Sequence, residues 1–310
     1  MAAQSSSAIS THKIPSLAPA TWAILGGLVL LYGPLFYHWV HGWLFKSISI
    51  EHEYYSHGVL GFPLAAYYVW QQRDRWNSMA NRKNLLGAAL LGLAAVMYLS
   101  GLADLVNLSL FALLLGMTLW LKGLDGLKLQ AFPLLLLLLA VPTDMPYLAT
   151  TKVLTLQQVI ASFIGVILNL LGNPVTVNNI YVYFTDGAII EVAPYCAGLK
   201  LLFTNIYVGL MLLYWTGLGK SRSRSFTFMG AVVILSFLAN VLRNTVLSVF
   251  HGGGNDSAFI WLHEGWGGDV FSLIMLGGVF WMLTSIETYW PIPSDRTDNS
   301  SNGNDLSPAG

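Results

Sequence analysis

The chain has 310 residues, of which 55% are hydrophobic and only 10% are charged, against about 25% charged residues in an ordinary soluble domain. Its formal net charge is zero and its mean hydropathy is +0.60. These values exclude a water-soluble globule. They also exclude a nucleic-acid partner, because binding to phosphates depends on clustered Lys and Arg.

Eight stretches of the sequence are apolar enough to be candidates for membrane-crossing helices, each of which needs about twenty residues. In chain order they are 22–40, 57–71, 85–103, 105–121, 127–141, 196–216, 226–250 and 270–290. The second and fifth are short, and Asp104 alone separates the third from the fourth, so the count is about eight. The expected fold class is therefore an all-α polytopic membrane protein.

The two ends of the chain are polar and differ from the apolar region between them. Residues 1–20 lack the small-residue cleavage pattern of a signal peptide, and residues 291–310 are rich in Ser, Asn, Asp and Pro. Segments of such composition bury too little apolar surface to offset the conformational entropy that is lost on ordering. We therefore expect two disordered cytoplasmic tails around a single membrane domain over residues 21–290.

Lys and Arg gather in alternate connections between the apolar stretches, and connections of this kind lie in the cytoplasm. The basic residues of these connections are Arg73, Arg75, Arg82, Lys83, Lys122, Lys128, Lys220, Arg222 and Arg224. Eight spans then place both termini in the cytoplasm, and the connections 41–56, 142–195 and 251–269 face outward. The expected location is the inner (plasma) membrane, with the lipid bilayer as a partner.

The outward connection 142–195 contains two patterns of regular structure. Apolar residues recur at roughly helical spacing over residues 147–171, which predicts an amphipathic helix at the interface or capping the bundle. Residues 175–184 and 188–192 flank the turn Thr185–Gly187, which predicts a short β-hairpin. This hairpin leads the chain to Cys196.

Three reactive or charged residues are predicted on the outward side. Cys196 opens the sixth span, Arg243 lies about two turns before the outer end of the seventh, and His263 precedes the eighth. The positive end of a helix favours a thiolate, and Lys200, one turn further on, adds to that effect. An arginine within a span is a functional-site candidate because an unpaired charge there is costly.

Each of these residues also has a purely structural interpretation. Cys196 is the only cysteine, so it forms no intramolecular disulfide, and a lone cysteine is typically a small buried side chain. Arg243 can extend to the membrane surface, and His263 is typical of a surface histidine. Their convergence on one side of the membrane, inferred from loop charges alone, favours a functional site.

Other outward residues are less informative. His57 and the pair Glu51 and Glu53 are typical of a solvated rim. The sequence contains no H-E-x-x-H motif or equivalent spacing, so we expect no metal and no other cofactor.

Three segments resemble the signature blocks of the exosortase/archaeosortase family, which are polytopic membrane cysteine transpeptidases that process proteins with a C-terminal sorting signal. The segments are Glu191–Lys200 (EVAPYCAGLK), Ala239–Asn244 (ANVLRN) and His263–Gly265 (HEG). Tyr55–Gly58 (YSHG) resembles the N-terminal block, so the resemblance spans about His52 to Trp290. Ala197 stands where the family commonly has Ser, and Lys200 where it commonly has Arg, which indicates a divergent branch such as the cyanobacterial one.

The resemblance implies roles for the site residues. Cys196 corresponds to the nucleophile that forms a thioester acyl-enzyme. His263 corresponds to the histidine that protonates the leaving amine and later deprotonates water or an incoming amine. Arg243 corresponds to the conserved arginine, which would hold the oxyanion or the substrate backbone.

Several polar neighbours are expected to support these three residues. Asn240 and Asn244 share a helix face with Arg243 and are candidates to orient it. Three outward carboxylates are candidates to orient His263, and the sequence does not choose among Asp186, Glu191 and Glu264.

The resemblance also implies membrane-anchored protein substrates. Their tails would carry a short Pro-Glu-Pro-like (PEP-CTERM-like) motif, a spanning helix and a basic cytoplasmic cluster, which places the cut site at the outer surface. A rival interpretation is a transporter or flippase that binds an anionic substrate or a lipid head group through Arg243. A third is a component of exopolysaccharide assembly without catalysis. The sequence does not decide whether water or an amine resolves the acyl-enzyme, which molecule supplies that amine, or what the oligomeric state is.

Overall fold

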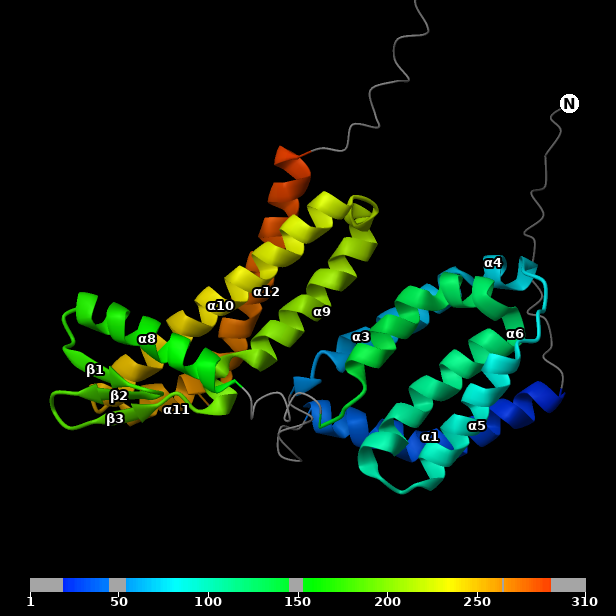
Figure 1. The fold of residues 1–310 in the computed structure, drawn as a ribbon, viewed down its shortest axis with the longest axis horizontal. Coiled ribbons are helices and arrows are strands. Elements are labelled where there is room, and N and C mark those ends of the chain that lie inside the picture. The colour runs from blue at the N-terminus through cyan, green and yellow to red at the C-terminus, as the bar shows by residue number, and fades with distance from the viewer. Residues whose placement is uncertain (1–18, 45–53, 145–152, 264, 291–310) are drawn as a thin grey trace, which may run out of the picture.

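The computed structural model describes residues 19–44, 54–144, 153–263 and 265–290. Figure 1 shows two groups of elements. The first group contains the helices α1 (Pro19–Leu44), α3 (Gly58–Gln71), α4 (Arg73–Ser78), α5 (Leu85–Leu99) and α6 (Ala103–Ala140). The second group contains α8 (Leu154–Leu170), β1 (Val175–Asn178), β2 (Tyr181–Phe184), β3 (Ile189–Glu191), η1 (Pro194–Ala197), α9 (Leu199–Thr216), η2 (Leu218–Lys220), α10 (Arg222–Gly252), α11 (Asp256–His263) and α12 (Trp266–Tyr289).

The described part is mostly helical and carries one small sheet, so the expected class is confirmed at this coarser level. Four described helices, α6, α9, α10 and α12, are long and apolar enough to cross a membrane, and α5 and α8 are apolar but shorter. Each of the eight predicted stretches falls largely within a helix. The count of eight crossings stays a prediction.

One helix contains two of the predicted stretches because its backbone breaks in the middle. The 38 residues of α6 include Gly123, whose φ of 64° and ψ of −152° are not helical. A side chain at such a φ would clash with the backbone, so only glycine adopts it readily. The fourth and fifth predicted stretches are thus the two limbs of α6 (Figure 1).

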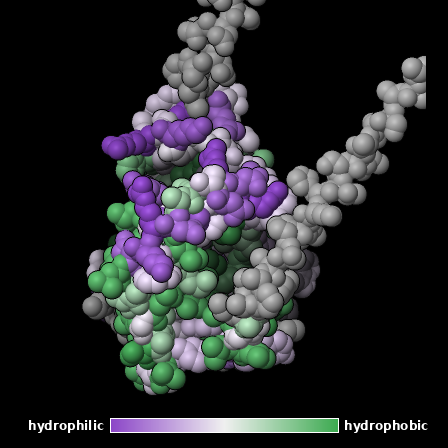
Figure 2. Space-filling view, turned by 90° about the vertical axis from the view of Figure 1, so that its right-hand side faces the viewer, coloured by the Kyte–Doolittle hydropathy of each residue, from purple (hydrophilic) through white to green (hydrophobic). Residues whose placement is uncertain are grey.

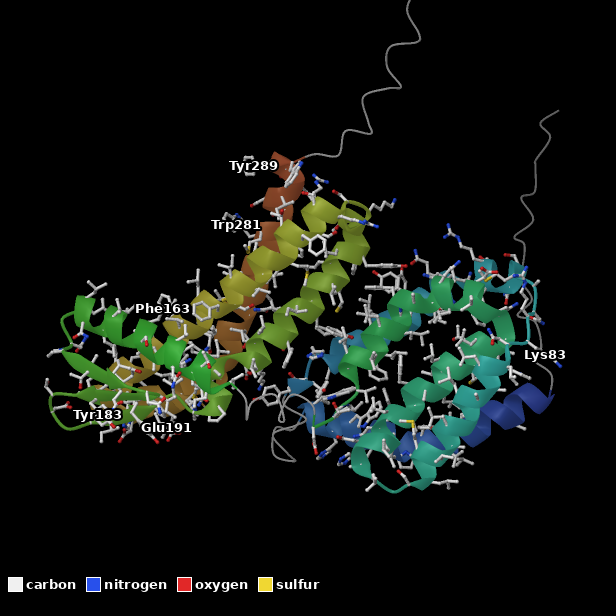
Figure 3. All side chains as sticks on the ribbon, in the orientation of Figure 1. Lys83, Phe163, Tyr183, Glu191, Trp281 and Tyr289 are labelled. Carbon is white, nitrogen blue, oxygen red and sulfur yellow. The ribbon has the colours of Figure 1, made fainter. Side chains whose placement is uncertain are left out.

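Large apolar side chains cover the outside of the helices. Leu30, Leu85 and Leu99 are about four-fifths exposed, at 79%, 82% and 82%, and Trp281 and Tyr289 project from α12 in Figure 3. Figure 2 shows apolar residues over the lower part of one face and hydrophilic residues gathered at its upper end. A lipid bilayer is the solvent in which such a surface is stable.

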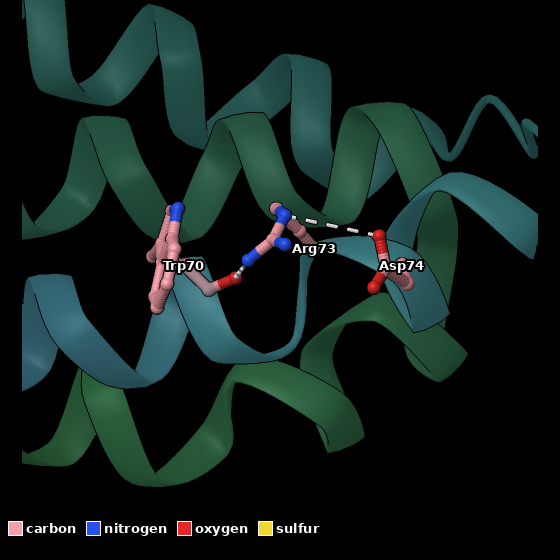
Figure 4. A network of polar contacts seen from close by, with 3 residues as sticks. All are labelled: Trp70, Arg73 and Asp74. Atoms are coloured by element: carbon pink, nitrogen blue, oxygen red, sulfur yellow. Dashed lines mark hydrogen bonds and ion pairs between the residues drawn. The ribbon is translucent and has the colours of Figure 1, made fainter. Parts of the chain in front are cut away.

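The basic connection after α3 is held by aromatic and carbonyl partners. The Arg73 guanidinium lies 4.4 Å from the Trp70 ring centre and donates a hydrogen bond of 3.2 Å to the Trp70 carbonyl. It also forms a 3.8 Å ion pair with Asp74, and Figure 4 shows the three residues together. Nζ of Lys122 donates to the Met79 carbonyl at 2.7 Å. In Figure 1, α4 and the α9–α10 turn lie at one end of the molecule, whereas the sheet and α11 lie towards the other.

Helix α10 is the centre of the second group and packs against α8, α9, α11 and α12. Helix α8 covers the sheet, and their shared core consists of Ile160, Ala161, Ile164, Leu168, Val175, Val182, Val192, Ala197 and Val241. The amphipathic helix is therefore confirmed over Leu154–Leu170. Residues 147–152 of the prediction include no described position.

The predicted hairpin is a three-stranded antiparallel meander in the order β1-β2-β3. The expected single strand over 175–184 reverses at Asn179, which has a positive φ of 61°. Asparagine tolerates this left-handed conformation and favours turns, so the turn Asn179-Ile180 splits the strand. The prediction of two strands was wrong because the apolar alternation concealed this turn. The connection 251–269 also contains a helix that was not predicted, α11.

Aromatic residues of α9 join the two groups of helices. The Tyr207 hydroxyl donates to the Leu136 carbonyl at 3.1 Å, and the His57 ring lies 4.3 Å from the Tyr207 ring. Further along α9, Tyr214 stacks on Phe132 at 3.7 Å. His57 is only 6% exposed, so its assignment to a solvated rim was wrong. Glu51 and Glu53 of that assignment lie outside the described residues.

The core between α8 and the sheet gives a stability prediction. Ile164 is 1% exposed, whereas Val166 on the same helix is 58% exposed. Truncation of a buried isoleucine removes apolar contacts and leaves a cavity, so Ile164→Ala should cost about 2 to 4 kcal/mol. The thermal unfolding midpoint in detergent should fall clearly for Ile164→Ala and little for the control Val166→Ala. Equal midpoints would show that this core does not contribute to stability.

Candidate active site

Cys196 lies in the short 3-10 helix η1, immediately before α9. Pro194 begins this turn, and the Cys196 N–H donates to the Ala193 carbonyl at 2.8 Å. Gly198 follows with a φ of 78°, which lets the chain turn sharply into α9. The expectation that Cys196 opens the sixth helix is corrected, because α9 begins at Leu199 and the cysteine precedes it.

Two asparagines of α10 hold the backbone of this turn. Nδ2 of Asn240 and Nδ2 of Asn244 donate to the Cys196 carbonyl at 2.9 and 3.0 Å. Asn244 also donates to the Asn240 side-chain oxygen at 3.2 Å. A Cβ on Gly198 would lie 2.4 Å from Cγ of Asn240, so glycine is needed for this close approach. The structure therefore corrects the prediction that both asparagines orient Arg243, since they position Cys196.

Arg243 lies between these asparagines on α10 and contacts the end of α11. Its Nη2 donates to the carbonyls of Leu262 and His263 at 3.2 and 3.4 Å. The last carbonyls of a helix lack partners within the helix and carry partial negative charge, so a cation binds them well. Nε of Arg243 is buried and has no acceptor among the described residues. Arg243 thus holds the histidine segment and keeps one N–H for another acceptor.

His263 is the last residue of α11 and is half-buried. Its ring stacks on Phe259 at 5.2 Å with an interplanar angle of 11°. Phe259 in turn lies 5.6 Å from the His251 ring on α10. This ring packing and the bond from Arg243 to the His263 carbonyl restrict where the imidazole can lie.

A cavity of about 670 Å³ brings most of the predicted site residues together. The predicted residues that line it are Cys196, Lys200, Asn240, Arg243, Asn244 and His263. Glu191 is exposed at the end of β3 (Figure 3) and does not line the cavity. Asp186 accepts a hydrogen bond from the Ala188 N–H in the turn before β3. Glu264 lies outside the described residues.

The cavity also contains residues that the sequence analysis missed. Polar and aromatic examples are Trp43, Tyr54, Thr204, Asn205, Asp269 and Ser272. Asp269 interacts electrostatically with Arg243 and lies in the first turn of α12, which begins at Trp266. The predicted helix began at Val270, so Asp269 fell in the preceding connection, where a carboxylate does not indicate a functional site. Trp43 lies on α1 and Tyr54 precedes α3, so the first group of helices also contributes to the cavity lining.

The environment of Cys196 differs from the predicted one. Burial raises the pKa of the Cys196 thiol above its ordinary value, and the positive charge of Arg243 opposes that rise. The predicted cation was Lys200, acting together with the helix N-terminus. The burial effect is the larger one, so it opposes the predicted preference for the thiolate.

Within the described ranges, no group of three or more His, Cys, Asp or Glu side chains is arranged to hold a metal ion.

The comparison with known families was made on the whole chain. The family model described as transmembrane exosortase (Exosortase_EpsH) matches residues 47–280. The chain belongs to the transmembrane exosortase family. This membership supports a general role as a membrane transpeptidase or protease. The part of the exosortase that matches contains Cys196, Arg243 and His263. No curated protein and no solved structure matches the chain.

The Gly198 turn gives a prediction about the geometry of the exosortase site. In Gly198→Ala the new methyl group meets Asn240, and the positive φ adds strain of about 1 to 2 kcal/mol. The turn should shift away from α10, and the rate at which a thiol reagent modifies Cys196 should change severalfold. Gly219→Ala is a suitable control because a Cβ there has no neighbour closer than 3.5 Å. An unchanged rate in Gly198→Ala would contradict the close fit of the turn.

The charge of Arg243 gives a prediction about pH dependence. A cation favours the thiolate, so its removal in Arg243→Gln should raise the pKa of the Cys196 thiol further. The midpoint of alkylation rate against pH should therefore move to higher pH. Arg222→Gln, which changes an exposed arginine at the start of α10, should leave the midpoint unchanged. A midpoint that falls, or that moves equally in both variants, would contradict this assignment.

Proposed function

We propose that this protein is a membrane-embedded cysteine protease or transpeptidase that cleaves C-terminal, PEP-CTERM-like sorting signals through a thioester acyl-enzyme. The observation that supports this proposal is the cavity that Cys196, Arg243 and His263 line together. These residues come from three different elements, η1, α10 and α11. A nucleophile, a proton-transfer group and a cation in one enclosed space are the components that acyl transfer requires.

In the proposed first step, Sγ of Cys196 attacks the carbonyl carbon of the scissile peptide bond. Because burial raises the pKa of the Cys196 thiol, His263 takes the thiol proton as the sulfur attacks. The tetrahedral intermediate then collapses, the C–N bond breaks, and His263 returns the proton to the leaving amine. The products of this step are a thioester on Cys196 and a released C-terminal tail.

Arg243 is the proposed stabiliser of the oxyanion. Its Nη2 is engaged by the carbonyls at the end of α11, whereas its buried Nε has no acceptor among the described residues. A fixed N–H donor such as Arg243 Nε stabilises the negative charge of the transition state most strongly in a low-dielectric site. Asp269 is the proposed partner that keeps the guanidinium in place, because its charge lies close to that of Arg243.

In the second step, water or an amine attacks the thioester, and His263 accepts the proton of the incoming group. Attack by water gives hydrolysis, and attack by an amine gives transfer to that amine. Asn240 and Asn244 keep the Cys196 backbone in place through both steps, since both amides bind its carbonyl. No cofactor is needed in this scheme.

The proposed substrate is a membrane-anchored protein whose sorting tail has a spanning helix and a basic cytoplasmic cluster. The proposed orientation places both termini in the cytoplasm and the cavity at the extracytoplasmic face of the inner membrane. Two observations support it. The basic connections lie at one end of the molecule, and the sheet and α11 lie towards the other (Figure 1). No nucleic acid takes part.

The proposed nucleophile gives the main functional prediction. Cys196→Ala removes the sulfur that forms the thioester, so cleavage should be lost. In a host strain without the native gene, proteins with such tails should accumulate at full length on immunoblots. Thr288→Ala, an exposed change far along α12, should restore cleavage as the wild type does.

The same experiment separates the enzyme from a transporter. A transporter or flippase that binds an anion through Arg243 should tolerate Cys196→Ser and lose activity in Arg243→Ala. Normal processing in a strain that carries Cys196→Ala would overturn the proposed function.

A further inference from the structure

Asn205 lines the same cavity from α9 and is fully buried, with an exposed fraction of 0%. It lies seven positions after Gly198, which also lines the cavity. At a rise of 1.5 Å per residue, this separation is about 10 Å along the helix axis. The cavity therefore extends from the cysteine turn along α9.

The orientation of the Asn205 amide follows from a chain of hydrogen bonds. Oγ of Ser236 donates its proton to the Val232 carbonyl at 2.7 Å. Ser236 can therefore only accept from Asn205, whose Nδ2 lies 2.9 Å from that oxygen. The amide nitrogen of Asn205 is thus fixed towards α10, and its Oδ1 is fixed away from Ser236.

Oδ1 of Asn205 has no hydrogen-bond donor among the described residues. A buried acceptor without a partner costs about 1 to 3 kcal/mol, and in a membrane there is no bulk water to replace the partner. A fully buried carbonyl oxygen of this kind in a cavity indicates that a bound molecule supplies the donor. A neutral donor fits this cavity, because its described lining already has two cations, Lys200 and Arg243, against one carboxylate, Asp269.

The proposed substrate supplies such donors directly after its cut site. Its spanning helix begins there, and the first four N–H groups of a helix have no partner within that helix. These groups enter the membrane, where every backbone polar group needs a hydrogen bond. Asparagine oxygen is a preferred acceptor for the first N–H groups of a helix.

We propose that Asn205 Oδ1 caps the spanning helix of the substrate by accepting a hydrogen bond from a backbone N–H in its first turn. Asn205 is then a binding residue on the leaving side of the scissile bond. It fixes the distance between the start of the substrate helix and the bond that Cys196 attacks. This inference rests on the proposed function, because it takes the occupant of the cavity to be a sorting tail.

The test is a scan of peptide-to-ester substitutions in a synthetic sorting-tail peptide with its spanning segment. Each ester removes one backbone N–H without changing a side chain. Binding is measured to the full-length protein carrying Cys196→Ala in lipid nanodiscs, so that it is read without cleavage. One position in the first turn should weaken binding about five- to fifty-fold, the loss expected when a buried acceptor is left without its donor.

The same scan on the Cys196→Ala, Asn205→Ala protein identifies the acceptor. The ester effect should fall below about two-fold there, because the N–H no longer has its partner. Ser236→Ala is the matched control. It removes the internal hydrogen bond of Asn205 but keeps Oδ1, which can still accept the peptide N–H. An ester effect above about two-fold should therefore remain, reduced by the loss of the fixed amide orientation. Thermal unfolding midpoints of the variants confirm that each is folded.

The outcomes separate this inference from the proposed function. A flat scan with a peptide that the wild type cleaves would overturn the role of Asn205 and leave the proposed function standing. An ester effect that persists in Asn205→Ala would also overturn it. A peptide that binds with the expected ester effect but is never cleaved supports the cap and contradicts the protease. A peptide that is neither bound nor cleaved contradicts both.

Discussion

The site depends on backbone carbonyls that lack partners in their own segments and bind side chains of α10. Asn240 and Asn244 bind the carbonyl of Cys196, and Arg243, between them, binds the carbonyls at the end of α11. One turn of one helix therefore positions two segments that are far apart in the sequence. In a low-dielectric surrounding such hydrogen bonds are strong and their loss is costly. This turn explains how a small sheet, a 3-10 turn and a short helix become parts of a single site.

Around this turn, the packed regions that stabilise the fold differ from the cavity that contains the candidate site residues. Packing between α8 and the sheet has an apolar core, flanked by hydrogen bonds between the Asn169 side chain of α8 and the backbone of Val175 in β1. It supports the turn that carries Cys196 from one side. The aromatic contacts of Tyr207 and Tyr214 fix α9 against the first group of helices. The cavity lies between these two packed regions and takes walls from both groups. Polar groups with unused hydrogen-bonding capacity among the described residues, Arg243 Nε and Asn205 Oδ1, are found in its lining.

Composition and local spacing were sufficient for the helices, because apolar runs of that length are stable only as helices in lipid. They also pointed to Cys196, Arg243 and His263, whose chemistry is unusual for such a chain. The local details that failed include the turn at Asn179 and the start of α12 before Asp269. The hydrogen-bond partners of the site residues could not be predicted for a different reason. The hydrogen bonds to the Cys196 carbonyl join residues 44 and 48 positions apart, and no periodicity in a single sequence reveals such a pairing. The burial that raises the thiol pKa is likewise a property of the assembled fold.

The two asparagines bind the backbone of residue 196 and make no use of its side chain in this arrangement. The hydrogen bonds that position the backbone of residue 196 are therefore independent of its sulfur atom. A change at residue 196 alters the proposed nucleophile while the carbonyl keeps both of its donors. A change at Asn240 or Asn244 leaves the sulfur intact and removes one of the hydrogen bonds that position its backbone. Replacement of the cysteine side chain therefore leaves both hydrogen bonds that hold the turn against α10 in place.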